Sequence, residues 1–296
     1  MSGLVKDTTH VINCLRKLRG GSQPILAQAS DGLTYVVKFT SNLQGANLPF
    51  NESIGTELYK ACGLSVPTWR PLLVTDTFLD RNPGCWMQTE DGRLRPDSGL
   101  CFGSRFLGGD DVTLFEILAS NSLARVHNRE SFWLAWMIDI CAQHTDNRQA
   151  VFLEDGKRRL EAFFIDQGSL FGGSTGEKQP GFVASRYLDQ RIYQNLSLKY
   201  SQSMLRTALS LDTDQLWKQM QMLPDDWKTE SAIEGFELCL DRLSKAIFLL
   251  NVIDTMFDAN RKGHGCIERT TYIESTLPIL CSGIQAKRPR NNLAHV

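Results

Sequence analysis

The sequence predicts an α+β protein of two lobes, a small N-lobe built on an antiparallel sheet and a mostly helical C-lobe. Short β-rich runs bounded by glycine, proline and aspartate fill the first third of the chain, and apolar residues at helical spacing dominate from about residue 112. One further pair of strands, at 150–153 and 161–166, lies within the helical part. Strands that precede helices instead of alternating with them are typical of this class. We expect an N-lobe over 1–109, a C-lobe over 110–283 and a disordered tail over 284–296.

The composition limits the classes of function. The 32 basic and 33 acidic residues give a net charge of −1, so no overall field favours nucleic acid or an anionic membrane. No apolar run reaches the length of a membrane span, and the N-terminus lacks the apolar core of a signal peptide. The eight cysteines occur without CxxC pairs, which favours reduced, buried thiols over a disulfide framework. We therefore expect a cytoplasmic protein without a membrane or direct nucleic-acid partner.

The N-lobe contains a glycine pair followed by a hairpin. Strands are predicted at 24–29 and 33–39, and Gly20, Gly21 and Ser22 precede them. A glycine pair lets backbone N–H groups approach phosphate oxygens without a Cβ atom in the way. Taken alone, the same run is more typical of a flexible entry loop, so its meaning depends on the residues that follow.

Lys38 lies in the apolar run YVVKF, where both faces of the strand are expected to be buried. A buried ammonium group needs an anion, unless its stem extends to water at the end of the strand. Glu52 is the candidate partner, in a helix predicted from Asn51 as N-cap to Cys62, with Gly63 beyond its end. The helix dipole would also explain an acid in the first turn. A strand lysine paired with a helix glutamate can grip phosphate groups.

The remaining elements follow in order along the chain. Further N-lobe strands are predicted within 66–78 and 99–109, the second running into a glycine break. Helices are expected at 114–126 and 131–143, and the second is apolar nearly all round, as a central buried helix would be. After a glycine-rich loop, residues 201–260 are predicted to form helices that are split by LPDDW.

Two aspartates flank the strand pair within the C-lobe. Asp146 precedes the first strand in the loop HTDNRQ, and Asp166 ends the second. Because a tight turn through Asp155-Gly156 joins the strands, both acids should lie at the same end of the ribbon. Either aspartate alone would be interpreted as a turn former. Together with Lys38 and Glu52, they instead predict a proton acceptor and a metal ligand beside a phosphate.

The motifs GGSQP, YVVKF, LPFNE, CGLSVP, CFGSRF, HTDNRQAVF and FFIDQG occur in an order that resembles the HipA-like kinase family, within the wider protein-kinase-like fold. The resemblance covers roughly residues 10–260. DNRQAVF, RYLDQRIY and LPDDW resemble the compact bacterial branch of this family. The resemblance implies a bilobal protein-kinase-like fold and ATP- and Mg²⁺-dependent phosphate transfer to a serine or threonine hydroxyl of a protein.

The resemblance also implies a role for each candidate residue. The residues that would hold ATP are Gly20, Gly21, Ser22, Lys38 and Glu52. The glycine loop would cover the phosphates, and the lysine, oriented by the glutamate, would hold the α- and β-phosphates. Asp146 would orient the acceptor hydroxyl or accept its proton, and Asp166 would bind Mg²⁺.

One position departs from the family pattern. Val151 stands where the catalytic loop of the family has a metal-binding asparagine. Gln149 could supply the missing carbonyl oxygen, as a catalytic and metal-binding residue, and Arg148 could balance the local negative charge. The departure leaves open a nucleotide-binding pseudokinase or interaction module. A small-molecule kinase of the same fold, with residues 174–200 lining an acceptor pocket, is also left open.

The sequence does not name an acceptor or a partner. A protein substrate and a small-molecule acceptor are both compatible with the motifs, and the resemblance leaves room for an antitoxin-like partner. We find no DNA-binding motif in the chain, so any role at DNA would have to come through such a partner.

Overall fold

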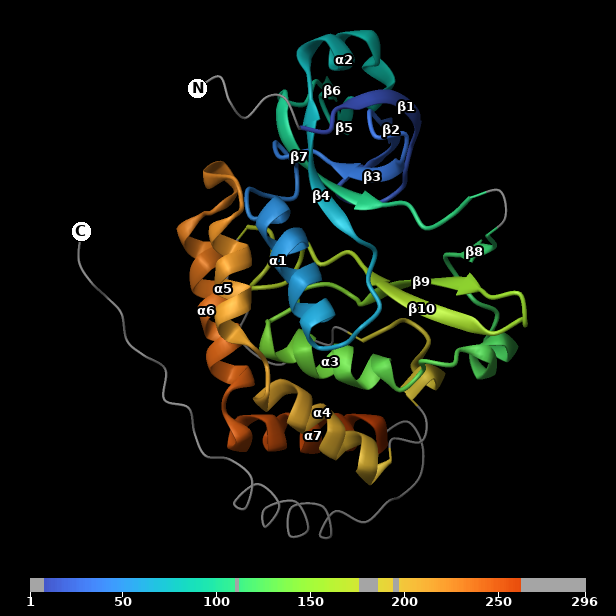
Figure 1. Cartoon of the computed structure of the whole chain (residues 1–296), viewed down its shortest axis with the longest axis vertical. Coiled ribbons are helices and arrows are strands. Elements are labelled where there is room, and N and C mark those ends of the chain that lie inside the picture. Colours follow the sequence, from blue (N-terminus) through green and yellow to red (C-terminus); the bar gives the residue numbers. More distant parts are fainter. Residues whose placement is uncertain (1–7, 110–111, 176–185, 194–196, 262–296) are drawn as a thin grey trace, which may run out of the picture.

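The computed structural model describes residues 8–109, 112–175, 186–193 and 197–261, and the predicted tail over 284–296 lies outside these ranges. As predicted, a small lobe built on an antiparallel sheet is followed by a larger helical lobe (Figure 1). The lobe boundaries proposed from the sequence stay a prediction. None of the helices in these ranges combines the length and the hydropathy that a membrane crossing requires.

The N-lobe sheet has the strand order β1-β2-β3-β7-β4, and all neighbours are antiparallel. The strands are β1 (Val11–Lys17), β2 (Ile25–Ala29), β3 (Thr34–Lys38), β4 (Trp69–Val74) and β7 (Gly99–Arg105). Strands β2 and β3 form the predicted hairpin, and Gly32 turns it with a φ of 79°. Short elements between β4 and β7 cover the lobe: α2 (Asp76–Arg81), β5 (Met87–Thr89) and β6 (Gly92–Leu94). Phe78 and Leu79 of α2 pack into the same buried cluster as Ile25 of β2 and Val37 of β3.

Helix α1 (Leu48–Ala61) begins earlier than predicted, because Asn47 and not Asn51 stands at its N-cap position. Pro49 lies in the first turn, where a proline costs no hydrogen bond and its fixed φ favours the helix. The expected end is confirmed: Gly63 follows the helix with a φ of 77°, a left-handed conformation that glycine adopts easily.

The C-lobe is built around the predicted central helix. Its helices are α3 (Ser131–Cys141), α4 (Leu198–Leu209), α5 (Thr213–Gln221), α6 (Glu230–Leu243) and α7 (Ala246–Arg261). The short turn η4 (Asp225–Trp227) separates α5 from α6, as the LPDDW segment indicated. Nearly every residue of α3 is buried, which explains why this helix lacks a polar face.

The prediction of a helix at 114–126 is wrong. Its first part forms a short strand, β8 (Leu114–Phe115), and its second part a 3-10 helix, η2 (Ser120–Arg125). The strand pairs with β9 (Gln149–Glu154) and extends the C-lobe hairpin by one strand. Residues 114–115 pair with the backbone groups at the open edge of β9, and this pairing outweighs the helical pattern. The Ser-Asn-Ser segment weakens that pattern further, because these residues disfavour helix interiors.

The C-lobe hairpin is confirmed in its predicted place. Strand β9 pairs with β10 (Leu160–Ile165) in continuous antiparallel register, with Gln149 opposite Ile165. Phe132 of α3 packs against the hairpin, with its ring centroid 4.9 Å from that of Phe164. The ends of β9 and β10 that carry the candidate acids are therefore held on a rigid, buried base.

Gly235 in α6 is expected to tolerate no side chain. A Cβ atom added there would lie 2.2 Å from the backbone oxygen of Phe171, which α6 therefore approaches closely. We expect Gly235→Ala to lower the free energy of unfolding by about 1–3 kcal/mol, although alanine favours helices over glycine. Urea denaturation measures this, with Glu237→Ala on the exposed face of α6 as the control within about 0.5 kcal/mol. A more stable Gly235→Ala protein would contradict the close approach.

Candidate active site

All candidate residues predicted from the sequence line a single cavity of 1190 Å³. They are Gly20, Gly21, Ser22, Lys38, Glu52, Asp146, Arg148, Gln149 and Asp166. They come from the β1–β2 turn, β3, α1 and the open end of the C-lobe hairpin, where β9 begins and β10 ends, so the cavity lies between the two lobes. The structure thus brings together residues that are far apart in the sequence, as a ligand site between lobes requires.

Lys38 forms the centre of a buried ionic cluster. Its Nζ atom forms an ion pair with Glu52 Oε1 and lies 2.6 Å from Asp166 Oδ1. Burial alone would lower the pKa of the lysine, but the charges of Asp166 and Glu52 outweigh burial and raise this pKa. Lys38 is therefore a permanent cation, and the predicted pairing with Glu52 is confirmed.

Asp166 presents its carboxylate to the cavity from a left-handed backbone with a φ of 63°. Burial would raise the pKa of this carboxyl group, but the Lys38 ammonium lowers it to about 2. Gln149 Nε2 donates a hydrogen bond to Asp166 Oδ2 over 2.7 Å. Because the amide nitrogen of Gln149 is engaged in this way, its oxygen is left for a ligand.

The donors around Asp166 fit a magnesium ion. Mg²⁺ prefers hard oxygen ligands and needs only one or two protein carboxylates besides phosphates and water. One carboxylate and the neighbouring Gln149 amide provide such a set. Within the described ranges, no group of three or more His, Cys, Asp or Glu side chains forms a metal site independent of a ligand. A metal at Asp166 would therefore depend on phosphate oxygens as further ligands.

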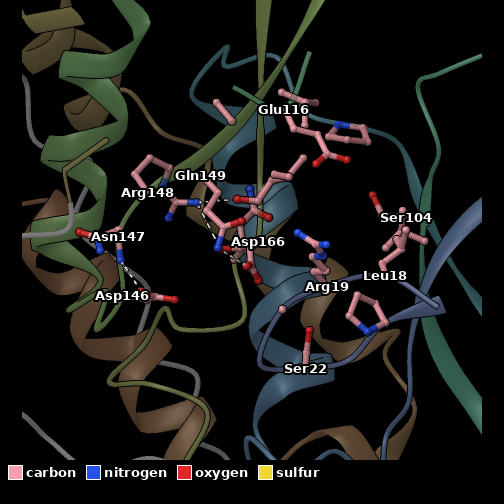
Figure 2. Close-up of a pocket in the computed structure, with 18 of the residues that line it drawn as sticks. Leu18, Arg19, Ser22, Ser104, Glu116, Asp146, Asn147, Arg148, Gln149 and Asp166 are labelled. Atoms are coloured by element: carbon pink, nitrogen blue, oxygen red, sulfur yellow. Dashed lines mark hydrogen bonds between the residues drawn. The ribbon is translucent and has the colours of Figure 1, made fainter. Parts of the chain in front are cut away.

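Asp146 lies exposed next to Asn147 in the loop before β9 (Figure 2), with Oδ1 accepting a hydrogen bond from Asn147 N over 2.7 Å. Its backbone carbonyl is held by His144, whose Nδ1 lies 2.6 Å from the oxygen. Burial and the charge of Arg148 lower the pKa of His144, so the imidazole is neutral and donates through Nδ1. The sequence interpretation did not identify His144 as a positioning residue.

Arg148 is buried behind the loop that carries Asp146 and binds an acid that does not line the cavity. Its Nη2 and Nε atoms lie 2.6 and 2.9 Å from the two carboxylate oxygens of Asp139 on α3. Tyr59 of α1 also donates to Asp139 Oδ1, over 2.5 Å. Nη1 of Arg148 donates to the carbonyl oxygen of Ile165 over 3.0 Å. The main partner of Arg148 is therefore Asp139, and the expectation that Arg148 balances negative charge at the cavity stays a prediction.

The sequence itself indicates that Asp139 is buried. This acid lies in the helix SFWLAWMIDIC, which is otherwise apolar. An acid that is expected to be buried must find a cation, and Arg148 in the following loop was the nearest one. The pairing could have been predicted from burial alone.

Helix α1 is bound directly to the backbone that follows Asp166. The side-chain amide nitrogen of Asn51 lies 2.9, 2.8 and 3.2 Å from the carbonyl oxygens of Gly168, Leu170 and Gly173. Glu52 Oε1 accepts a hydrogen bond from Gly168 N over 2.9 Å. A Cβ atom added at Gly55 would lie 2.7 Å from Gln167 Cβ. The helix and this loop are therefore packed without space for a further methyl group.

The glycine loop forms a compact turn between β1 and β2. Gln23 N donates to the carbonyl oxygen of Gly20 over 3.1 Å, and Gly20 has a φ of 130°. Ser22 is buried, and its carbonyl oxygen accepts a hydrogen bond from Asn42 Nδ2 over 2.8 Å. The loop is therefore fixed at the edge of the cavity.

Val151 lies where the sequence interpretation identified a missing metal ligand. It is buried in β9 and lines the cavity together with Val36 of β3 and Ile165 of β10. This section of the cavity is apolar, whereas the section around Asp166 is polar. Such a division suits a ligand with a flat apolar ring at one end and charged groups at the other.

An antiparallel sheet over a helical lobe, with the buried Lys38–Glu52 pair reaching Asp166, defines a protein-kinase-like fold. No family model and no curated protein matches the chain. Among solved structures, the Helicobacter pylori proinflammatory kinase CtkA is 12% identical, with a TM-score of 0.51 over 82% of this chain and 98% of that chain. The Golgi casein kinase with Mn/ADP bound is 12% identical, with a TM-score of 0.50 over 85% of this chain and 75% of that chain. At this identity, the likeness shows the fold.

Proposed function

We propose that this protein is a kinase that uses ATP and Mg²⁺ to phosphorylate a hydroxyl group. The observation that carries the proposal is the convergence of Lys38, Glu52, Asp166, Gln149 and Asp146 on one cavity between the lobes. Phosphoryl transfer depends on positioning and on neutralising charge more than on covalent chemistry. The Golgi casein kinase structure, which has Mn/ADP bound, supports the use of a nucleotide and a divalent metal ion.

Each residue has a role that its geometry supports. Lys38 would hold the phosphates, because its charge is permanent and Glu52 fixes its position. Asp166 and Gln149 would hold Mg²⁺, which neutralises phosphate charge when bound. Asp146, exposed at the edge of the cavity, would orient the acceptor hydroxyl and take its proton. The apolar section of the cavity would receive the adenine ring.

We further propose a serine or threonine of a protein as the acceptor. Ile117 and Leu188 both line the cavity and are each 81% exposed. Exposed apolar side chains at the mouth of a site favour contact with another polypeptide over a small polar molecule. The order of the motifs supports a kinase of the bacterial HipA-like type, and an antitoxin-like partner is part of this proposal. The scattered cysteines, which favour reduced thiols, support a cytoplasmic location.

Nucleotide binding and transfer are tested separately. We expect ATP with Mg²⁺ to raise the melting temperature of the wild type, and labelled ATP to transfer its γ-phosphate to a protein in a cell lysate. A phosphorylated small molecule would instead support a small-molecule kinase. A thermal shift without any labelled product would support a pseudokinase. Absence of a shift at millimolar ATP would contradict the proposal.

Asp146→Asn is expected to reduce transfer by about 10²- to 10⁴-fold, because the amide cannot accept the hydroxyl proton. The thermal shift with ATP should remain, since Asp146 holds the acceptor and not the nucleotide. Asp214→Asn, an exposed change on α5 away from the cavity, is the matched control. Transfer by Asp146→Asn at the rate of this control would remove Asp146 from the mechanism.

A further inference from the structure

Arg19 directly precedes the glycine pair, and its charged end faces the cavity. The side chain is exposed and lines the same cavity as Lys38 and Asp166. Figure 2 shows its guanidinium group pointing from the glycine loop into the space in front of Asp166. Among the described residues, the structure gives this group no ion pair or hydrogen bond. The group is therefore available to a ligand in the cavity.

The backbone around Arg19 is held in place on both sides. Leu18 N donates to the carbonyl oxygen of Pro24 over 2.8 Å and closes the turn. The Gln23 side chain forms two hydrogen bonds of 2.7 Å with the backbone of Gln88, one to its N–H and one to its carbonyl oxygen. The backbone of Arg19 is thus already ordered, so less conformational entropy is lost when Arg19 binds a ligand.

The carboxylates of the cavity would repel a polyphosphate, and the positive charge of Arg19 would reduce this repulsion. The ammonium group of Lys38 is shared between Glu52 and Asp166, and Asp146 contributes a further carboxylate. This part of the cavity is therefore acidic before any ligand enters, although a nucleotide polyphosphate is itself strongly negative. Mg²⁺ would offset part of this repulsion at Asp166. The guanidinium group of Arg19 is placed to offset it from the opposite side.

We propose that Arg19 binds the polyphosphate chain of the nucleotide from the glycine-loop side, facing the metal ligand Asp166. This inference rests on the proposed kinase function. A guanidinium group offers paired N–H donors that match phosphate oxygens and keeps its charge at every working pH. The phosphates would then lie between a cation on the N-lobe and the metal on the C-lobe, and Lys38 would be a further cation in contact with them.

The test compares ligands that carry different numbers of phosphates. Calorimetric titrations of the full chain with adenosine, AMP, ADP and ATP, each with Mg²⁺, give the affinity of each ligand. We expect Arg19→Gln to weaken ATP binding by about tenfold or more and adenosine binding by less than about twofold. Arg19→Lys should recover part of the ATP affinity. Arg81→Gln, an exposed change in the same lobe outside the cavity, is the control.

The outcomes separate the inference from the function on which it rests. If Arg19→Gln binds ATP as tightly as Arg81→Gln does, the inference is wrong and the kinase function stands. If Arg19→Gln weakens adenosine as much as ATP, Arg19 supports the loop and not the phosphates, which also overturns the inference. If the wild type binds none of these ligands, the proposed function fails first. A loss that grows from AMP to ATP supports the contact.

Discussion

Asp166→Asn should reduce phosphate transfer by at least about a thousandfold while the protein stays folded. The carboxylate is the charged ligand in the predicted metal site, and an amide binds Mg²⁺ far more weakly. With a pKa of about 2, Asp166 is ionised at every pH at which the enzyme would work. Asparagine accepts the left-handed backbone at this position, and Lys38 keeps Glu52 as its partner.

Two measurements check this prediction. Transfer from labelled ATP gives the loss of activity, with Asp214→Asn as the exposed control. Titration with Mn²⁺ in the presence of ADP gives the metal-dependent part of the thermal shift, which the Asp166→Asn protein should lack. A variant with wild-type turnover and an unchanged metal titration would show that Asp166 does not bind the metal. The proposed kinase function would then lose its main support.

The pH dependence of stability follows from the same pKa. The folded-state pKa of Asp166 lies below the ordinary value for an aspartate. This group therefore contributes stability that is fully present above its unfolded pKa of about 4. The contribution should be lost as the pH falls toward 2. Acid unfolding of Asp166→Asn should show a smaller dependence on pH in this window than the wild type.

Arg148→Met is expected to lower the free energy of unfolding by about 3–5 kcal/mol. The Asp139–Arg148 pair is fully buried, with both side chains at 0% exposure. Removing the guanidinium group would leave a buried carboxylate whose only remaining hydrogen-bond donor in the described structure is the hydroxyl group of Tyr59. Asp139→Leu should have a similar cost, because it leaves a buried cation. Urea denaturation measures both.

A double-mutant cycle tests whether the cost comes from the unpaired charge. The protein with both Asp139→Leu and Arg148→Met should be more stable than the sum of the single changes predicts, because neither charge is left without its partner. Arg159→Met, which removes an exposed partner of Asp155, should cost less than about 1 kcal/mol. Additive costs for the buried pair would show that packing and not charge dominates there.

The hairpin and its two acids were predictable because they depend on local signals. Alternating apolar residues and the Asp155-Gly156 turn fix the register, and the register fixes which residues share an end. The same holds for Lys38 and Glu52, since a buried lysine needs a carboxylate and the helix supplied one nearby. The resemblance to HipA-like kinases then implied that these four residues meet at one nucleotide site.

Other features depend on contacts between distant segments and could not be predicted in the same way. Asn51 has the residue type of an N-cap, but its amide binds carbonyl oxygens of the 168–173 loop, which no local pattern indicates. The 114–126 segment forms β8 because the edge of β9 was unpaired. Arg19 was not identified because an arginine before a glycine pair is common in exposed loops, and only the direction of its side chain distinguishes it.

The attachment of α1 to the loop after Asp166 limits how this protein can be switched. Rotating α1 outward would break the contacts of Asn51 and Glu52 and leave buried polar groups without partners, each at about 1–3 kcal/mol. Regulation by an outward rotation of α1 would therefore have a high free-energy cost. A ligand that covers the exposed side chains of Ile117 and Leu188 at the cavity would block the proposed site without breaking these contacts. An inhibitor of the proposed activity should therefore be designed to bind at Ile117 and Leu188 and not to displace α1.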